Sequence, residues 1–341
     1  MRRYNQLYKL AFAFFALTLA QSCKKSNGID NNTVIKKPYG LYIGTNSGDL
    51  IKTNDGLNFS TVFGADRIPY RAILTAGPTN LLIVKSNVHL SENGGRNFNP
   101  VYTQYPAPDF MAKWNSMILN VEGHGRIYLS SIDPATKGIV YSEDNGKKWL
   151  PDDNWDEGLI GGGITSFAQL KNGALFAFGD ANDSLYLRND KEDSWSHYPT
   201  NVTHPAGFSY LSRFNNTLLL TDYNGVEGVH YSNDSGKTWT KYQGLPANVK
   251  LYATHAPFDR VLLVGTDSMG VYRLENGIFV PANNGLETYT TVYAIAGEED
   301  VYKNGVEKKY IYIATDKGLY RSDDMGFSWA LMLEGDFGAL H

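Results

Sequence analysis

Cysteine is the scarcest residue in the chain, because Cys23 is the only one among 341 residues. One thiol can form neither an internal disulfide nor a zinc site of several thiolates. The seven histidines show no spacing typical of metal ligands, and the chain has no P-loop and no dinucleotide fingerprint. We therefore expect no metal and no cofactor.

Charge is also scarce. Charged residues make up 19% of the chain, the formal net charge is −4, and the calculated pI is about 6.0. This balance provides no broad basic surface, so we expect no nucleic-acid partner. The chain is instead rich in Gly, with 34 residues, and in Tyr, with 23. Such a composition suits many short strands and tight turns better than amphipathic helices.

No apolar run is long enough to span a bilayer as a mature helix. The longest such segment, residues 10–20, is too short, and it follows the basic residues Arg2 and Arg3. A basic start, a short apolar run and small residues are together typical of a secretory signal.

The segment ends at Cys23, and its last residues resemble a bacterial lipobox, although Gln21 is an unusual occupant. We expect residues 1–22 to be a lipoprotein signal peptide and Cys23 to be lipidated. Residues 23–38 are polar and predict a flexible tether. The lipid would be the chain's only membrane contact, in the periplasm or on the outer-membrane or cell surface. A plain signal peptide with a stray cysteine is the alternative.

The main signal in the sequence is a repeat, Ser-x-Asp-x-Gly-x-x-Trp. Three complete copies are Ser142, Asp144, Gly146 and Trp149; Ser232, Asp234, Gly236 and Trp239; and Ser322, Asp324, Gly326 and Trp329. Weaker copies run from Lys52 to Phe59, from Ser91 to Phe98, from Asp190 to Trp195 and from Arg273 to Val280. Successive copies are 39 to 51 residues apart, the period expected of four-stranded propeller blades.

Short apolar segments bounded by turn residues accompany every copy and predict strands. Each unit reads as strand A, strand B, strand C, the repeat turn and strand D. We therefore predict an all-β fold, a single seven-bladed β-propeller over residues 39–341. The first unit lacks its own strand A, and we expect residues 336–341 to supply it, with residues 33–35 as the alternative.

The complete copies resemble the Asp-box, or BNR, repeat, and the resemblance covers the chain from about residue 39 to its end. That repeat occurs in bacterial sialidases, xyloglucan-cleaving glycosidases, sortilin-type receptors and photosystem II assembly-factor-like propellers. The resemblance implies that the repeat residues are structural and lie far from any active site. It does not specify a function, because fold and site are separate arguments.

A sialidase requires three arginines that converge on a carboxylate, a tyrosine nucleophile and an acidic proton donor. Only Arg71 and Arg213 fall on predicted inner strands. Sialidases also carry a Phe/Tyr-Arg-Ile-Pro motif before the first repeat, whereas residues 66–69 of this chain lack the aromatic residue and follow the first repeat. We therefore assign no catalytic residue and expect a binding or assembly module for a protein or a glycan. A sialidase-like exo-glycosidase acting on extracellular glycans is the alternative function.

Ligands of propellers favour the face that carries the D–A and B–C connections. Three predicted D–A loops, residues 101–115, 150–163 and 196–207, place aromatic side chains beside polar or acidic ones. Asp152 belongs to this set, either in a carboxylate pair or as a solvated loop charge. The predicted ligand face comprises Arg71, Tyr102, Tyr105, Asp109, Trp114, Asp153, Trp155, Asp156, His197, Tyr198 and Arg213. We expect the protein to be a monomer.

Overall fold

The computed structural model describes residues 40–54, 56–64, 67–76, 79–102, 117–123, 125–130, 138–152, 164–179, 184–191, 193–200, 202, 209–301 and 307–341. The expected signal peptide, Cys23 and the tether lie outside these residues. Residues 38–298 and 309–341 form one compact unit, the propeller, and residues 1–37 and 299–308 are assigned to a second. Among the described residues, no helix is both long and apolar enough to cross a membrane.

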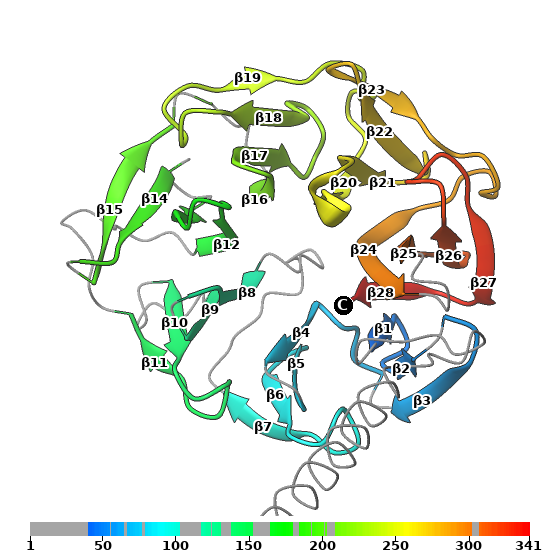
Figure 1. Ribbon diagram of the computed structural model, residues 1–341, viewed down its shortest axis with the longest axis horizontal. Helices are drawn as coiled ribbons and strands as arrows, with labels where there is room; N and C mark the ends of the chain where they lie inside the picture. The colour runs from blue at the N-terminus through cyan, green and yellow to red at the C-terminus, as the bar shows by residue number, and fades with distance from the viewer. Residues whose placement is uncertain are drawn as a thin grey trace, which may run out of the picture. The chain divides into compact units, whose positions relative to one another are not determined.

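Seven sheets of four antiparallel strands are arranged in a ring, which confirms the predicted seven-bladed β-propeller (Figure 1). From the inside outward, blade one contains β28 (Phe337–Leu340), β1 (Leu41–Thr45), β2 (Leu50–Thr53) and β3 (Phe59–Phe63). Blade two contains β4 (Ala72–Ala76), β5 (Asn80–Val84), β6 (Val88–Ser91) and β7 (Asn99–Tyr102). Blade three contains β8 (Ile118–Val121), β9 (Arg126–Ser130), β10 (Ile139–Ser142) and β11 (Leu150–Pro151).

The other four blades follow the same order. Blade four contains β12 (Ile164–Gln169), β13 (Leu175–Gly179), β14 (Ser184–Asn189) and β15 (Ser194–Pro199). Blade five contains β16 (Ser209–Phe214), β17 (Thr217–Asp222), β18 (Val229–Ser232) and β19 (Thr240–Lys241). Blade six contains β20 (Leu251–His255), β21 (Leu263–Thr266), β22 (Val271–Glu275) and β23 (Ile278–Pro281). Blade seven contains β24 (Val292–Val301), β25 (Glu307–Thr315), β26 (Gly318–Ser322) and β27 (Ala330–Glu334).

The ring is closed by the end of the chain, as predicted. Strand β28 pairs antiparallel with β1, with Ile43 opposite Leu340 and Gly44 opposite Ala339. Beyond the strand, the backbone of Tyr42 exchanges hydrogen bonds of 2.7 and 2.9 Å with His341. Blade one therefore combines the two ends of the propeller, and the inner edge of β1 is paired.

The core lies between the blades. Because both faces of a blade are covered by its neighbours, the second strands are continuous apolar runs, such as β13, in which all five residues are buried. Trp329 shows how neighbouring blades are joined, because it packs with Leu263 of blade six and Ile311 of its own blade. Its indole nitrogen donates a 2.8 Å hydrogen bond to the carbonyl of Ala282 in blade six.

The turns 142–149, 232–239 and 322–329 carry the complete repeat and are called the box turns. In each, the serine hydroxyl accepts from the glycine N–H at 2.8 or 2.9 Å and donates to the aspartate. The aspartate accepts in turn from backbone N–H groups later in the turn. Each box turn therefore satisfies several of its own backbone N–H groups.

Blade one departs from the repeat in one respect. The sequence pattern places Lys52 at the serine position, but the hydroxyl that accepts from the Gly56 N–H belongs to Thr53, at 2.8 Å. Thr53 is 1% exposed. The turn is therefore one residue shorter between hydroxyl and glycine than in the complete copies, a change that a fixed-spacing pattern does not detect.

Blades three and four are joined by a buried ion pair. Asp152 directly follows β11, and its carboxylate accepts from Arg188 Nη1 at 3.3 Å and from Trp195 Nε1 at 2.8 Å. The side chains of Asp152 and Arg188 are only 3% and 2% exposed. Neither prediction for Asp152 was right, because this carboxylate is neither solvated nor free for a catalytic pair. Arg188 occupies the position of the serine in the complete repeat, and its ion pair with Asp152 stabilises this weaker copy of the repeat.

Asp152→Ala should lower the free energy of unfolding by about 2 kcal/mol or more, because Trp195 Nε1 loses its acceptor and the buried guanidinium of Arg188 keeps only Asp193, which is 52% exposed. The matched control is Glu143→Ala, which removes an exposed partner of Arg126 and should cost less than about 1 kcal/mol. Denaturant titration measures both. A small loss for Asp152→Ala would contradict the assignment, as would the absence of rescue when Arg188→Met is added.

Candidate ligand-binding face

The propeller has two faces that differ in the connections they carry. The upper face consists of the D–A connections and the B–C turns, including residues 46–49, 85–87, 223–228, 267–270 and 316–317. The lower face consists of the A–B turns and the C–D turns, among them the box turns. Every inner strand therefore runs from the upper face to the lower face.

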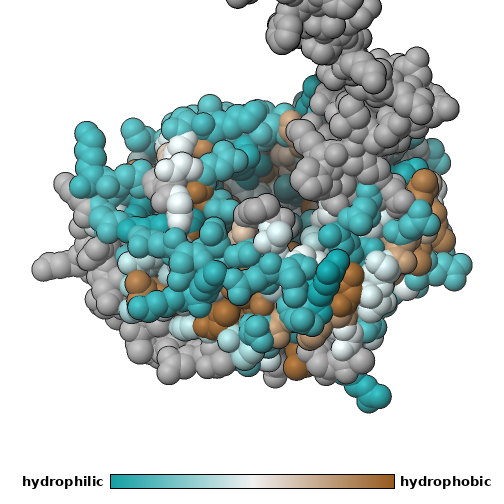
Figure 2. Space-filling model, turned by 60° about the horizontal axis from the view of Figure 1, so that its bottom comes forward, coloured by the Kyte–Doolittle hydropathy of each residue, from teal (hydrophilic) through white to brown (hydrophobic). Residues whose placement is uncertain are grey.

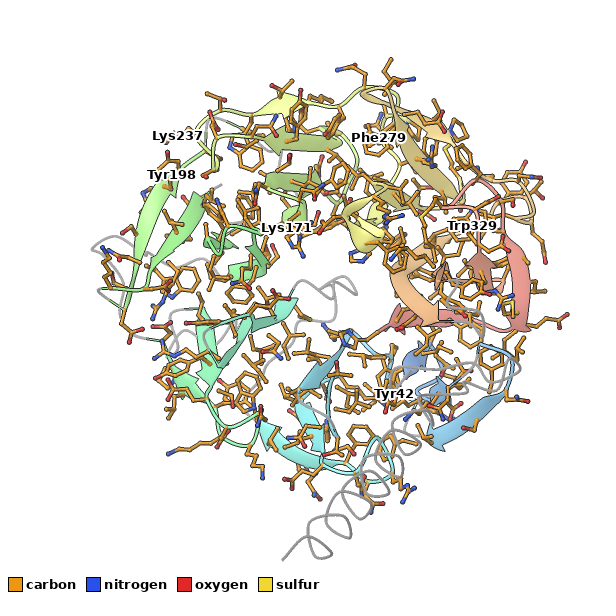
Figure 3. All side chains as sticks on the ribbon, viewed as in Figure 1. Tyr42, Lys171, Tyr198, Lys237, Phe279 and Trp329 are labelled. Atoms are coloured by element: carbon orange, nitrogen blue, oxygen red, sulfur yellow. The ribbon has the colours of Figure 1, made fainter. Side chains whose placement is uncertain are left out.

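The described residues do not bring the predicted ligand residues together on the upper face. Tyr105, Asp109, Trp114, Asp153, Trp155 and Asp156 lie outside the described residues. Tyr102, His197 and Tyr198 belong to outer strands and not to loops. Tyr102 lies 6.4 Å from Trp149 between ring centroids, and Tyr198 packs against the core of blades four and five at the outside of the ring (Figure 3). His197 contacts the Ser184 hydroxyl at 2.9 Å.

The two inner-strand arginines lie at opposite ends of the channel. Arg71 immediately precedes β4, at the upper face, where its backbone N–H donates to Val84. Arg213 is the fifth residue of β16 and lies near the lower face, where Nη1 contacts both carboxylate oxygens of Asp259 at 3.0 Å. The expectation that both arginines share the ligand face was therefore wrong, because Arg213 lies near the far end of a six-residue strand that starts at the upper face.

Three tyrosines on adjacent blades come together on the upper face instead. Tyr223 follows β17, Tyr252 is the second residue of β20, and Tyr293 is the second residue of β24. The ring centroids of Tyr223 and Tyr252 are 5.5 Å apart, and those of Tyr252 and Tyr293 are 5.0 Å apart. The planes meet at 78° and 71°, the edge-to-face arrangement that aromatic quadrupoles favour. We call these three residues the tyrosine ladder.

Tyr223 is held by a tight B–C turn. The Asp222 carboxylate is buried and accepts from the N–H groups of Asn224 and Glu227 at 3.0 and 2.8 Å. Gly225 adopts a φ of +72°, and a Cβ there would lie 1.9 Å from the carbonyl oxygen of Val249. The carbonyl of Tyr223 accepts from Leu251 N–H at 2.8 Å, so the turn is attached to the residue before Tyr252.

Tyr252 and Tyr293 are positioned by contacts between blades six and seven. Thr291 lies two residues before Tyr293, and its N–H donates to Asp316 at 2.8 Å. Its hydroxyl donates to Asp267 at 3.3 Å and accepts from Ser268 N–H at 3.1 Å. Thr291 thereby joins the B–C turns of both blades beside the ladder. These contacts use backbone and short side chains, which lose little entropy when ordered.

The ladder lies in a field of negative charge. Burial, followed by the charges of Asp336, Asp316 and Asp267, raises the pKa of Tyr293 to about 12. Burial and the contact with Tyr223 raise the pKa of Tyr252 well above its ordinary value. Both phenols are therefore neutral at physiological pH, so the ladder offers ring faces and hydroxyl groups beside three carboxylates.

Two other large side chains of the upper face are exposed to solvent. Tyr289, in the connection that leads into β24, is 80% exposed, and Met269 of the neighbouring B–C turn is 43% exposed. Over the surface shown in Figure 2, apolar side chains form small separate groups among hydrophilic ones. Within the described residues, no group of three or more His, Cys, Asp or Glu side chains could hold a metal ion. The arrangement is suited to binding by stacking, hydrogen bonding and charge.

The tyrosine ladder was not predicted, although the sequence carries a signal of it. Tyr252 and Tyr293 each stand eight residues after a Gly-Leu pair, at Gly244 and Gly285. They therefore occupy one position of the repeat, the second residue of an inner strand. Tyr210 has the same place in β16, but it is buried and its hydroxyl lies 3.2 Å from the Leu251 carbonyl oxygen. An alignment of the repeats at this position, and not only at the turns, would have revealed it.

Comparison with known proteins supports the fold. No family model and no curated protein matches the chain. YCF48 bound to a D1 peptide is similar, with a TM-score of 0.54, 12% identity, and coverage of 85% of this chain and 92% of that one. PorZ, a surface component of the type-IX secretion system of Porphyromonas gingivalis, gives 0.56 at 14% identity, over 88% of this chain but only 37% of PorZ. An inactive virginiamycin B lyase from Staphylococcus aureus with quinupristin gives 0.54 at 14% identity, over 83% and 94%.

The raised pKa of Tyr293 predicts a stability loss in alkali. An unfolded tyrosine titrates near pH 10, so the stabilisation is complete below about pH 10 and is lost as the pH rises toward about 12. Tyr293→Phe should remove this part of the pH dependence, measured by denaturant titration across that range. Tyr289→Phe is the control, since its ring is 80% exposed, and it should leave the dependence as in the parent. Equal slopes for parent and Tyr293→Phe would contradict the assignment.

Proposed function

We propose that this protein is an exported, lipid-anchored β-propeller that binds a protein partner on its upper face and serves in assembly, not in catalysis. The observation that carries the proposal is the tyrosine ladder beside three carboxylates, on adjacent rigid blades. Tyrosine is enriched where protein surfaces bind partners, because it supplies a large contact area and a hydroxyl at low entropic cost. Lipidation of Cys23 and the tether 23–38 would hold the propeller on a membrane.

Solved propellers of similar fold are compatible with this role. YCF48 has been solved with a D1 peptide bound, and PorZ is a surface component of a secretion system. At 12% and 14% identity these likenesses concern the fold, so they lend only the precedent that such a ring can serve binding and assembly. A glycan is the other ligand class, since tyrosine rings also stack on sugars.

The glycosidase alternative is disfavoured by the two arginines at opposite ends of the channel. Arg213 is held by Asp259 near the lower face, and therefore cannot join Arg71 around one substrate carboxylate. Virginiamycin B lyase has a similar fold and is an enzyme, so the fold itself does not exclude catalysis. A sialidase-like site is therefore disfavoured by the positions of the arginines and not by the fold.

Placing a photo-crosslinking amino acid at position 289 tests the binding face. Tyr289 lies at the upper face and is 80% exposed, and Leu57, in a turn of the lower face, is 68% exposed and serves as the control. In the producing cells, position 289 should give a protein adduct and position 57 should not. Equal adducts from both positions, or none, would contradict the proposal. Turnover of a fluorogenic sialoside that Arg71→Ala abolishes would favour the glycosidase, and glycan-array binding without an adduct would favour a glycan ligand.

The lipid anchor is tested separately. Metabolic labelling with a fatty-acid analogue should label the parent, and Cys23→Ser should abolish the label and release the protein from the membrane fraction. Because Cys23 is the only cysteine, no other thiol can take up the label. A labelled Cys23→Ser variant, or an unlabelled parent that is exported, would contradict lipidation.

A further inference from the structure

We propose that the tyrosine ladder and the carboxylates around it form a binding site for a cationic side chain, so that the partner presents a lysine or an arginine. This inference rests on the proposed function and specifies the chemistry of the partner. The site comprises the ladder residues with Asp267 and Asp316, which Thr291 contacts two residues before Tyr293, and Asp336, on the connection into blade one. The charge of Asp336 also contributes to the raised pKa of Tyr293.

The carboxylates carry more negative charge than the described residues neutralise. Asp267 accepts from the hydroxyls of Ser268 and Thr291, at 3.1 and 3.3 Å, and Asp336 accepts from the side-chain amide of Asn46. Asp316 accepts from a backbone N–H, and its only described cation is its neighbour Lys317, at 3.6 Å. The donors are thus almost all neutral, and they orient the carboxylates without cancelling their charge.

The aromatic rings favour the same kind of ligand. Successive ring planes of the ladder meet at 78° and 71°, so the rings do not cover one another face to face. The face of a phenol ring carries negative electrostatic potential and attracts ammonium and guanidinium groups. Phenol rings beside carboxylates combine cation–π attraction with charge attraction at one place, and partial burial strengthens both.

The upper face already holds cations of its own in this way. The ammonium group of Lys250 lies 5.8 Å from the Tyr223 ring centroid, at one end of the ladder. Between blades one and two, the ammonium group of Lys85 lies 4.0 Å from the Tyr70 centroid and donates to the Gly48 carbonyl at 3.1 Å. Lys85 is 1% exposed. The chain therefore uses tyrosine faces to accommodate ammonium groups at one end of the ladder and at one other point of this face.

Charge complementarity selects a protein segment over other occupants. A neutral sugar would gain stacking and hydrogen bonds from its hydroxyls to the carboxylates but no attraction between opposite charges, and an acidic sugar or a phosphate would be repelled. A lysine or an arginine gains from both features, and arginine in addition can stack on a ring while it donates to a carboxylate. We therefore infer that the occupant of the site is a segment of a partner protein that carries a basic residue.

The test uses the soluble propeller and short labelled Gly/Ser peptides that carry Arg, Lys or, as a neutral match, Gln. Fluorescence anisotropy should show binding of the Arg and Lys peptides and at least about tenfold weaker binding of the Gln peptide. Asp316→Asn keeps the acceptor for Thr291 N–H but removes the charge, and should weaken binding of the Arg peptide about tenfold. Asp323→Asn makes the same charge change on an exposed turn of the lower face and should leave binding unchanged.

A second pair of variants tests the rings. Tyr293→Leu should weaken the Arg peptide about tenfold, whereas Tyr293→Phe keeps the ring face and should bind as the parent does. Equal binding of Arg, Lys and Gln peptides, no binding of the basic peptides, or binding insensitive to Asp316→Asn and Tyr293→Leu would overturn the inference. A protein adduct at position 289 together with any of these results would leave the proposed function standing and reject only the cationic ligand.

Discussion

The pairing of β28 with β1 is the constraint on which the rest of the structure depends. A propeller blade contacts only its two neighbours, so a ring that is not closed would leave two blades with an uncovered face. Here the last strand of the chain supplies the inner strand of the first blade, and the Tyr42–His341 backbone bonds extend that pairing to the last residue. Closure fixes every blade relative to the next, including the three that contribute the tyrosine ladder.

The ladder illustrates how a repeat architecture generates a site. Tyr252 and Tyr293 occupy the same repeat position, so the ring symmetry itself brings their side chains to the same height on adjacent inner strands. Thr291 and Asp222 then set the local geometry through short hydrogen bonds. Rigid blades bear these residues, and mobile loops are not needed to assemble them. A site built in this way is organised before any ligand arrives, which lowers the ordering cost of binding.

The fold could be predicted from the sequence, and the site mostly could not. The spacing of the complete repeats and the apolar segments around them defined seven blades, and the missing first inner strand predicted the closing tail. A pattern of fixed spacing does not detect a hydroxyl group that is displaced by one residue, as at Thr53. It also does not detect an ion pair in place of the serine hydrogen bonds, as between Arg188 and Asp152. The ladder tyrosines are separated by 29 and 41 positions in the chain, and none of them lies in the aromatic loops that were predicted to bind the ligand. Arg213 was misplaced because strand membership alone does not say at which end a side chain lies.

The entry point of the chain into the ring sets the direction in which the protein would be displayed. Strand β1 runs from the lower to the upper face, and Gly40 at its start lies beside the pairing of Tyr42 with His341. With Cys23 lipidated as proposed, the tether of residues 23–38, at most about 58 Å long when fully extended, would attach at the lower rim. Attachment there would place the tyrosine ladder at the end of the propeller opposite the tether, so that the tether would not run across the face proposed to bind a partner.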